Sequence, residues 1–412
     1  MNKPNISDIH NCYGCGVCTK ACPVHIIDLH LNKEGFYEPF IAEEDKCIHC
    51  GLCRDVCAYI KDEPAQNNAP VVSYAAWSND EQVQKKCSSG GVGFEIGKYL
   101  LGKGYKVVGV RYNAEKGRAE HFIASSLEEL VQTTGSKYIQ SYPVDGWKDI
   151  DRKGKYLVTG TPCQIDSFRY YMKKMRLPEE NFILLDFFCH GVPSMLAWQK
   201  YCKDVEKKLG GKITYASWRN KWDYGWHDSW AMGIDSVKQC KKVDWHDSYN
   251  LLIRGKKTFF QSRLSQGDKF FRLFLGDQCL GRQCYEHCKY KYDHSSADIR
   301  ICDLWGKTYQ NNEDGVSGAV AFTEKGAEIL KAIDCHLVEH PFSVVGEGQM
   351  KTCPPMLPLR DKLIASLQDK NQPLSAAIAI MDAYNRRQRN FSRLKHPLRS
   401  MYHILNRIRK HL

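Results

Sequence analysis

Short apolar runs alternate with amphipathic stretches through the middle of the chain, and this alternation predicts strands that are followed by helices. Apolar runs typical of buried strands cover 106–110, 156–158 and 182–188, and helical spacing covers 94–101, 127–131, 165–175 and 195–209. Strands that alternate with helices favour an α/β layer with a partly parallel sheet. We therefore expect the fold class α/β for this region, in a chain that is α+β overall.

The pattern changes on both sides of this region. Residues 61–70 are polar and contain proline, which is typical of a linker. From about 213 to 260, tryptophan and tyrosine alternate with polar residues, which predicts an antiparallel or irregular segment. A further α/β stretch is expected to run to about residue 342, and the last fifty residues have a helical, basic pattern.

The first sixty residues carry one cysteine pattern twice, with the two copies thirty-five residues apart. The copies are Cys12, Cys15, Cys18 and Cys22, followed by Pro23, and then Cys47, Cys50, Cys53 and Cys57. Glycine follows the second cysteine of each copy, at Gly16 and Gly51. Three cysteines at this spacing let one tight turn present three thiolates to an iron–sulfur cubane. In two-cluster ferredoxins the fourth cysteine of each run ligates the other cluster.

These spacings predict two 4Fe–4S clusters in a bacterial-type ferredoxin module. The first cluster is assigned to Cys12, Cys15, Cys18 and Cys57, and the second to Cys47, Cys50, Cys53 and Cys22. The alternatives are zinc sites or free thiols, since Cys-x-x-Cys pairs also bind zinc. A tetrahedral zinc ion has no use for the third cysteine of each run, so clusters are favoured. Ala58 replaces the proline expected after the second run, which affects the turn and not the ligands.

Composition indicates the compartment of the protein and shows that its positive charge is concentrated at the C-terminal end. Nineteen cysteines without a signal peptide favour a reducing compartment, so we expect a cytoplasmic protein. No apolar stretch approaches eighteen residues, which argues against a membrane span. The formal charge is +12, and residues 386–412 hold seven Arg, two Lys and no acid. This tail suits an acidic partner or the anionic inner face of a membrane. Nucleic acid is not expected as a partner, because no reading motif accompanies the charge.

Three turns in the α/β region carry small and polar residues of the kind that line a cofactor. They are Ser88, Ser89, Gly90 and Gly91 before a helical pattern, Gly135, Ser136 and Lys137 after one, and Thr161, Pro162, Cys163 and Gln164 after the strand at 156–158. Free N–H groups at a helix start can bind a diphosphate, and ligands of open α/β sheets collect at strand carboxyl ends. An ordinary serine N-cap, a surface lysine and a buried cysteine are the alternatives for these turns.

Six motifs, in this order along the chain, resemble the coenzyme F-420 hydrogenase/dehydrogenase beta-subunit family. They are SSGGV at 88–92, GSKYIQS at 135–141, VTGTPCQ at 158–164, DFFCHGVPS at 186–194, CYEHC at 284–288 and ADIRICDLWG at 297–306. An N-terminal two-cluster ferredoxin is a familiar extension of this family. Its members oxidise or reduce coenzyme F-420, pass electrons to partner subunits, or reduce other substrates such as chlorophyll intermediates. Several bacterial relatives are encoded beside polysaccharide-synthesis genes.

The resemblance implies a flavin, FAD, lined by the three turns at 88–91, 135–137 and 161–164. It also favours a third 4Fe–4S cluster held by Cys163, Cys189, Cys284 and Cys288. The late pair is usually Cys-x-x-Cys in the family, whereas three residues separate Cys284 from Cys288 here. Cys279 and Cys302 are therefore alternative ligands, and a set of reduced buried cysteines is the remaining alternative.

Together these assignments divide the chain into four parts. They are a two-cluster ferredoxin over 1–62, the N-terminal part of a flavin-binding core over 72–205, its C-terminal part with the late cysteines over 206–345, and a basic helical tail over 355–412. The expected function is that of an iron–sulfur flavoprotein oxidoreductase. Electrons would pass between a redox partner protein or small carrier and a flavin.

The flavin would act on a two-electron substrate, either coenzyme F-420 or an unidentified compound such as one of a polysaccharide pathway. His190, in the turn after the strand at 182–188, is the candidate proton donor. A histidine beside a glycine turn is also commonly structural. The alternative function is that of a non-catalytic electron-transfer subunit in a larger redox complex.

Overall fold

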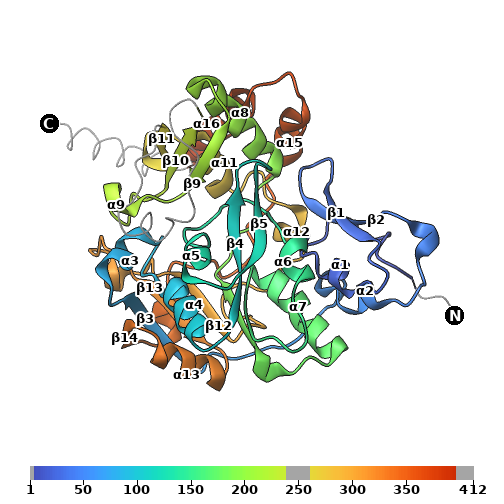
Figure 1. The fold of residues 1–412 in the computed structure, drawn as a ribbon. Coiled ribbons are helices and arrows are strands. Elements are labelled where there is room, and N and C mark those ends of the chain that lie inside the picture. Colours follow the sequence, from blue (N-terminus) through green and yellow to red (C-terminus); the bar gives the residue numbers. More distant parts are fainter. Residues whose placement is uncertain (1–3, 238–259, 396–412) are drawn as a thin grey trace.

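A mixed sheet of nine strands forms the centre of the computed structural model, which describes residues 4–237 and 260–395 (Figure 1). The strand order is β14-β3-β13-β12-β8-β7-β4-β5-β6. In chain order the strands are β3 (Val72–Ser78), β4 (Lys106–Asn113), β5 (Arg118–Ala124), β6 (Ser141–Tyr142), β7 (Tyr156–Thr159), β8 (Phe182–Phe187), β12 (Ile299–Asp303), β13 (Ser317–Ala321) and β14 (Cys335–Glu339). The four inner strands β12, β8, β7 and β4 are parallel to one another, whereas β4 is antiparallel to β5 and β12 is antiparallel to β13.

Both faces of the central strands are buried, which explains their continuous apolar runs. In β8, Ile183 packs into one hydrophobic core while the adjacent Leu184 packs into another, because successive residues point to opposite faces. The first core also takes residues from α4 (Val92–Gly102), α5 (Leu127–Val131) and α13 (Glu324–Ala332). The second takes residues from α6 (Val144–Lys148) and α7 (Pro162–Met175). The predicted α/β class and the strands and helices that define it are confirmed.

A second lobe sits above the sheet in Figure 1 and is mainly helical. Its helices α8 (Met195–Leu209), α11 (Lys269–Leu275), α15 (Arg360–Gln368) and α16 (Leu374–Lys395) pack on an antiparallel sheet of β9 (Ile213–Ser217), β10 (Ala231–Ser236) and β11 (Phe260–Arg263). The expected antiparallel segment is thus present, although residues 238–259 lie outside the described part. Of the basic tail, residues 396–412 also lie outside it. No described helix is both long and apolar enough to cross a membrane.

The N-terminal lobe, at the right of Figure 1, contains an antiparallel hairpin and short helices. These are α1 (Val17–Ala21), β1 (Ile27–Leu31), β2 (Tyr37–Ile41), the 3-10 turns η1 (Glu44–Lys46) and η2 (Ala58–Ile60), and α2 (Leu52–Asp55). The remaining short elements belong to the rest of the chain: α3 (Glu81–Lys86), η3 (Glu179–Asn181), α9 (Lys221–Tyr224), η5 (Leu264–Gln266), α12 (Arg282–Glu286), η6 (Lys307–Tyr309) and α14 (Phe342–Val345).

Polar clamps fix the N-terminal lobe on the core. Glu34, in the turn between β1 and β2, accepts hydrogen bonds from Arg282 (Nε, 3.2 Å) and Arg360. Gln140 accepts from the backbone N–H of Tyr37 (2.8 Å), and Lys289 donates to the carbonyl of Ala58 (2.9 Å). Burial opposes the charge on Glu34, but the two guanidinium groups outweigh it and lower the pKa of this carboxyl. The lobe is therefore held in one position relative to the core.

Candidate functional site

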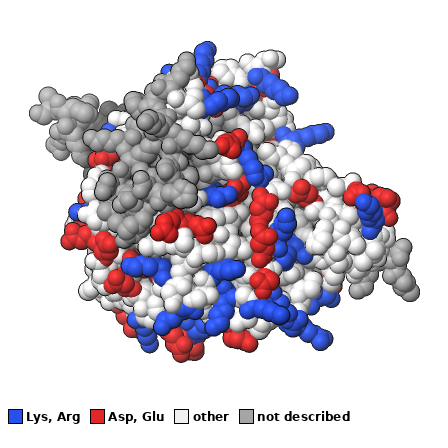
Figure 2. Space-filling view, viewed as in Figure 1, with Lys and Arg blue, Asp and Glu red and all other residues white. Residues whose placement is uncertain are grey.

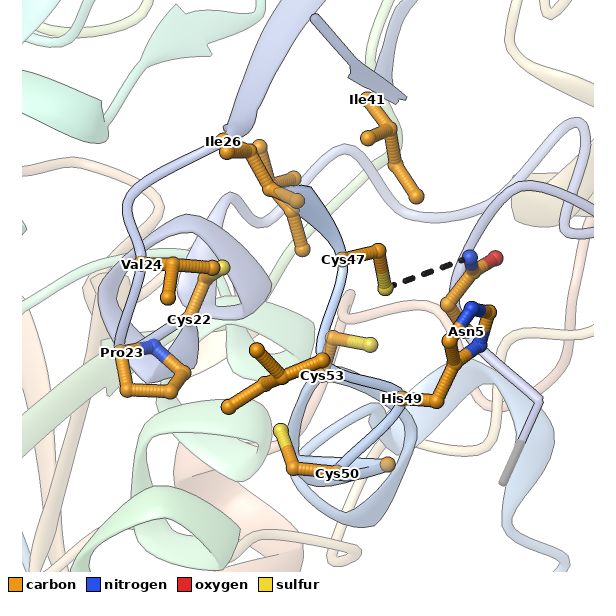
Figure 3. Close-up of a pocket in the computed structure, with 13 residues that line it drawn as sticks. Asn5, Cys22, Pro23, Val24, Ile26, Ile41, Cys47, His49, Cys50 and Cys53 are labelled. Atoms are coloured by element: carbon orange, nitrogen blue, oxygen red, sulfur yellow. Dashed lines mark hydrogen bonds between the residues drawn. The ribbon is translucent and has the colours of Figure 1, made fainter. Parts of the chain in front are cut away.

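Four cysteines line a pocket at the outer end of the N-terminal lobe (Figure 3). They are Cys22, Cys47, Cys50 and Cys53, the set that the sequence predicted for the second cluster. The pocket encloses ≈ 350 Å³, part of it open solvent, and its other walls are mostly apolar. The side-chain amide of Asn5 lies 3.7 Å from the sulfur of Cys47 as a hydrogen-bond donor. Hydrogen bonds to sulfur are one of the ways in which proteins tune an iron–sulfur cluster.

The repeated glycines explain how each run turns back on itself. Gly16 has φ 68° and Gly51 has φ 78°, and each directly precedes a short helix that carries the third cysteine of its run. Residues with a side chain rarely adopt this left-handed conformation. A Cβ at Gly16 would in addition lie 2.7 Å from a ring carbon of Pro143. The glycines therefore belong to the ligand-presenting turn and are required in both copies.

The set predicted for the first cluster lies deeper, where the N-terminal lobe meets α7. Burial raises the pKa of the Cys12 thiol well above its usual range, and the nearby thiols of Cys57 and Cys15 add to this effect. The same causes raise the pKa of Cys18. The Cys15 thiol donates to the hydroxyl of Ser167, on α7, at 3.2 Å. Three buried thiols and the half-buried Cys15, close enough to affect one another's charge, fit a positively charged metal centre, because coordination removes their protons.

Within residues 4–237 and 260–395, no three Cys, His, Asp or Glu side chains gather closely enough to hold one metal ion. A cubane spreads its ligands over four iron atoms, so the thiols around it lie farther apart than those around zinc.

A third group of thiols gathers where α7 begins. Cys163 lies close enough to Cys189 and Cys284 for their charges to raise its pKa, after the larger effect of burial. The charge of Cys288 likewise raises the pKa of Cys189 and of Cys284. The structure therefore brings together the four residues that the resemblance implied for a third cluster, despite the longer spacing of the late pair.

A fifth thiol, which the sequence analysis missed, belongs to the same group. Cys353 donates to the carbonyl of Cys288 at 3.2 Å, and its thiol also hydrogen-bonds the Cys288 sulfur. That contact lowers the pKa of Cys288 to about 6. No motif marks Cys353, which is sixty-five residues further along the chain. The alternative ligands pack elsewhere: Cys279 is in the core of the upper lobe and Cys302 is beside Val345.

The first and third groups of thiols are neighbours. Tyr13 and Tyr290 form one hydrophobic cluster, against which Cys15, Cys163 and Cys288 pack. The two tyrosine rings are 5.8 Å apart between centroids. The charge of Cys15 also acts on Cys163. The three groups of thiols thus form a series from the outer pocket, through the joint between the lobes, to the carboxyl ends of β7 and β8.

Two of the three turns expected at a flavin meet directly. The backbone N–H and hydroxyl of Ser136 lie 3.0 and 3.3 Å from the hydroxyl of Ser88. Gly91 has φ 86° and starts α4, which leaves the first N–H groups of the helix free of a side-chain cap. A Cβ at Gly90 would lie 2.3 Å from the carbonyl oxygen of Ala76, so this turn requires glycine. The hydroxyl of Ser89 donates a hydrogen bond to the carbonyl of Val316 (2.8 Å) and is therefore already engaged within the protein.

Lys137 has a different role from the one expected of a free cation. Its ammonium group donates to the carbonyls of Gln132, Thr133 and Thr134 at 3.1, 2.9 and 2.9 Å, at the end of α5. Burial lowers its pKa to about 7. Lys137 could bind an anion only by giving up these bonds. The neighbouring Gly135 is open to a ligand, because no atom lies near the position that a Cβ would take there.

Two cations that the sequence analysis missed hold the Ser88–Ser89 turn. Arg219 donates to the carbonyl of Ser88 at 3.1 Å and to Asp303 at 3.2 Å. Lys221 donates to the carbonyl of Ser89, and burial lowers its pKa to about 8. Both residues approach from the segment between β9 and β10, about 130 residues away in sequence, so no local pattern reveals them.

The third turn forms the start of α7. The N–H of Thr161 donates to the side-chain oxygen of Gln164 at 2.9 Å, which completes a capping box with Pro162 as the first helical residue. The Gln164 amide also donates to Ser141 at 3.2 Å. These side chains thus order the helix start, and Cys163 is the member of this turn that joins the third group of thiols.

His190 is held at the edge of the same region. Its Nε2 is 2.7 Å from a carboxylate oxygen of Asp277, and its ring packs on Phe274 with centroids 5.0 Å apart. The His190 side chain is 28% exposed. Lys291 donates to the backbone carbonyls of Cys189 and His190 at 2.6 and 3.1 Å, which fixes this turn.

Comparison with protein families matches three segments of the chain, between residues 11 and 340. Residues 73–146 match the N-terminal model of the coenzyme F420 hydrogenase/dehydrogenase beta subunit, and residues 153–340 match its C-terminal model. Residues 11–61 match a 4Fe–4S dicluster domain. The chain belongs to the coenzyme F420 hydrogenase/dehydrogenase beta-subunit family. The resemblance drawn from the six motifs is confirmed, and so is the ferredoxin module, which makes this chain an iron–sulfur member of an oxidoreductase family.

The relatives place the family in redox metabolism. A coenzyme F420-dependent sulfite reductase of Methanocaldococcus jannaschii is 24% identical over 338 residues, which are 80% of this chain and 47% of that protein. An uncharacterized protein of the same organism is 26% identical over 198 residues, 40% of this chain and 54% of the relative. This chain therefore spans about half the length of these curated relatives. A chain of the F420-reducing [NiFe] hydrogenase complex from Methanosarcina barkeri covers 76% of this chain, and 93% of itself, at 17% identity and a TM-score of 0.42.

Proposed function

We propose that this chain carries electrons between an external redox partner and a flavin that reduces or oxidises a two-electron substrate. The observation that supports this function is the series of three thiol groups that leads from the outer pocket to the turn at 161–164, one of the three turns proposed to line the flavin. Family membership supports the redox class, and the order of the thiol groups supports a relay. The proposed substrate is a coenzyme F-420-type carrier, as the name of the sulfite reductase relative suggests.

In this proposal, Cys22, Cys47, Cys50 and Cys53 hold the outer cluster, and Cys12, Cys15, Cys18 and Cys57 hold the inner one. Cys163, Cys189, Cys284 and Cys288 hold a third, with Cys353 as a hydrogen-bond donor to Cys288. The Ser167 hydroxyl beside Cys15 belongs to α7, the helix whose first turn carries Cys163, so one helix positions ligands of two proposed clusters. When bound, the clusters would carry single electrons and FAD would exchange one electron at a time for two.

The protein groups around the proposed flavin have separate roles. The uncapped start of α4 after Gly91 supplies N–H groups, and Gly135 supplies space, for the anionic part of a dinucleotide. The N–H groups of Gly90 and Ser136 are bonded to Ser317 and Ser88 and shape these turns. Arg219 and Lys221 hold the Ser88–Ser89 turn in place. His190, paired with Asp277, holds a proton at Nε2 or Nδ1 next to the third thiol group.

The test is the iron, sulfide and flavin content of protein purified without oxygen, compared with two variants. We expect about twelve irons and one flavin, from three four-iron clusters. Cys50→Ser should lose about four irons and keep the flavin, whereas Cys202→Ser, which changes a half-buried cysteine outside the three groups, should keep all of them. Zinc in place of iron would contradict the proposal.

Activity separates the two candidate functions. Oxidation of reduced coenzyme F-420 by the isolated holoprotein, with a viologen dye as acceptor, would establish the enzyme. Full cofactor content without turnover of the coenzyme would instead support the alternative, a non-catalytic electron-transfer subunit of a larger complex.

A further inference from the structure

The outer thiol pocket opens onto an unusually apolar surface. Ile48, which stands between the ligand candidates Cys47 and Cys50, is 60% exposed, and Val24 is 38% exposed. Both residues line the same pocket as the four thiols, together with the exposed Pro23. Exposed apolar groups that gather at one site mark a surface that another molecule covers. We call Pro23, Val24, Ile48 and the adjacent Glu43, Glu44 and Asp45 the outer face.

The charge of this surface is opposite to that of the chain as a whole. Residues 1–62 contain nine acidic and six basic residues, a formal charge of −3, within a chain of +12. Glu43, Glu44 and Asp45 are consecutive, exposed, and end two residues before Cys47. In the face that Figure 2 shows, acidic and basic side chains lie together near the outer end of the N-terminal lobe, and the rest of the visible surface of this lobe is largely uncharged. An apolar centre is therefore bordered by negative charge.

We propose that the outer face docks a small one-electron carrier protein whose redox centre lies in an apolar patch bordered by Lys and Arg. This inference rests on the proposed function, in which the outer thiols hold a cluster. In the transfer, one electron leaves the reduced cluster and reduces the carrier by one electron, and no bond forms or breaks. Opposite charges speed the encounter, and a small apolar contact keeps the complex short-lived, as suits electron transfer.

A carrier protein fits this surface better than a second copy of the chain. A two-fold interface would place the same surface on both partners. The acidic residues 43–45 of one copy would then lie near those of the other, and their negative charges would repel each other. A small organic carrier would need neither an exposed isoleucine nor a charged border. The basic border expected on the partner follows directly from the acidic border here.

The experiment uses ferricytochrome c as a probe, since it is a small haem protein whose exposed haem edge is bordered by lysines. Holoprotein is reduced without oxygen, and the second-order rate of cytochrome reduction is measured by stopped flow at low and high salt. Glu44→Lys should lower this rate about three- to tenfold at low salt and have little effect at high salt, because salt screens exposed charges. Glu328→Lys, an exposed site on α13 with the same charge change, is the matched control and should have no such effect.

The apolar part is tested with Ile48→Ser, which should lower the rate to cytochrome c at every salt concentration. Val71→Ser, at an apolar residue 47% exposed outside the outer face, is its control. Benzoquinone, a small neutral oxidant, should oxidise all variants at the same rate. Equal rates for Glu44→Lys and Glu328→Lys would overturn the proposal.

Two other results would have separate meanings. A dimer of the wild-type chain that Ile48→Ser dissociates, seen by analytical ultracentrifugation, would identify a second copy as the occupant and overturn the carrier. Protein that contains no 4Fe–4S iron after purification without oxygen would instead refute the proposed function, before any rate is measured.

Discussion

The ion pair between Asp186 and Arg300 offers a direct test of how the core supports the third thiol group. Two hydrogen bonds of 2.7 Å join the carboxylate of β8 to the guanidinium of β12, and their side chains are 0% and 1% exposed. Arg300 also donates to the carbonyls of Tyr292 (2.8 Å) and His294 (3.0 Å). The pair therefore ties the loop that follows Cys288 to the centre of the sheet.

Asp186→Asn keeps the shape of the side chain but leaves the Arg300 charge buried without a counter-ion. Breaking a buried pair on one side costs about 3–5 kcal/mol, and the retained amide oxygen favours the lower end of this range. For an unfolding slope of about 3 kcal/mol per molar urea, a loss of about 3 kcal/mol lowers the midpoint by about 1 M. Such a loss is a large part of the roughly 5–15 kcal/mol that stabilises a typical folded protein.

The assay is urea unfolding of the anaerobic holoprotein, followed by tryptophan fluorescence. Glu43→Gln is the control, because it removes an ion pair with Lys46 in which both side chains are more than half exposed. Pairs of that kind contribute about 0–1 kcal/mol. If Asp186→Asn unfolds within 1 kcal/mol of the wild type, the Arg300 charge is satisfied by backbone carbonyls alone and the reasoning is refuted.

Three further predictions concern single residues. Burial lowers the pKa of His121 to about 4, well below its value in the unfolded chain. As the pH falls from about 6.5 toward 4, the unfolded chain gains a proton at His121 that the folded protein does not, so the free energy of unfolding decreases. Between pH 7.5 and 5.5 this should lower the free energy of unfolding by about 1 kcal/mol, and His121→Leu should remove that part of the pH dependence. Cys288→Ser should lose about four irons, whereas Cys353→Ser should keep them and shift the midpoint potential of one cluster, measured by redox titration with electron paramagnetic resonance; equal iron loss in both would make Cys353 a ligand. Lys221→Met should release the proposed flavin and keep the ferredoxin irons, and an unchanged flavin content would contradict the proposed role of Lys221 at Ser89.

The parts that the sequence predicted best depend on local spacing. The eight ferredoxin cysteines could be divided into two sets because ligand spacing is a property of the run itself, and the structure gathers both sets as expected. The strands β7 and β8 could be found for a similar reason, since burial on both faces requires a continuous apolar run. Helix α5 matches its predicted range because Ser126 caps its start and the apolar spacing is short and regular.

The parts that the sequence missed depend on contacts between distant segments. Nothing near Cys353 in the chain marks it as a neighbour of Cys288, and Arg219 reaches Ser88 across 131 residues. Lys137 shows a different limit, because a lysine after a helix can either meet a ligand or bind the helix carbonyls, and only the folded backbone decides between them. The strand order, in which β3 lies between β13 and β14, also follows from long-range packing that no local period records.

The unequal depth of the two ferredoxin ligand sets has a consequence for how the protein is built and maintained. Cys12, Cys18 and Cys57 are buried, and Cys15 is bonded to Ser167 of the core, whereas Cys47 and Cys50 are partly exposed at an open pocket. A cluster held by the inner set, as proposed, would therefore have to be inserted before the N-terminal lobe closes on α7. A cluster held by the outer set could be installed, or replaced after oxidative damage, in the finished protein. Oxygen should accordingly remove iron in a fixed order, from the outer site first, and repair of that site should need no unfolding.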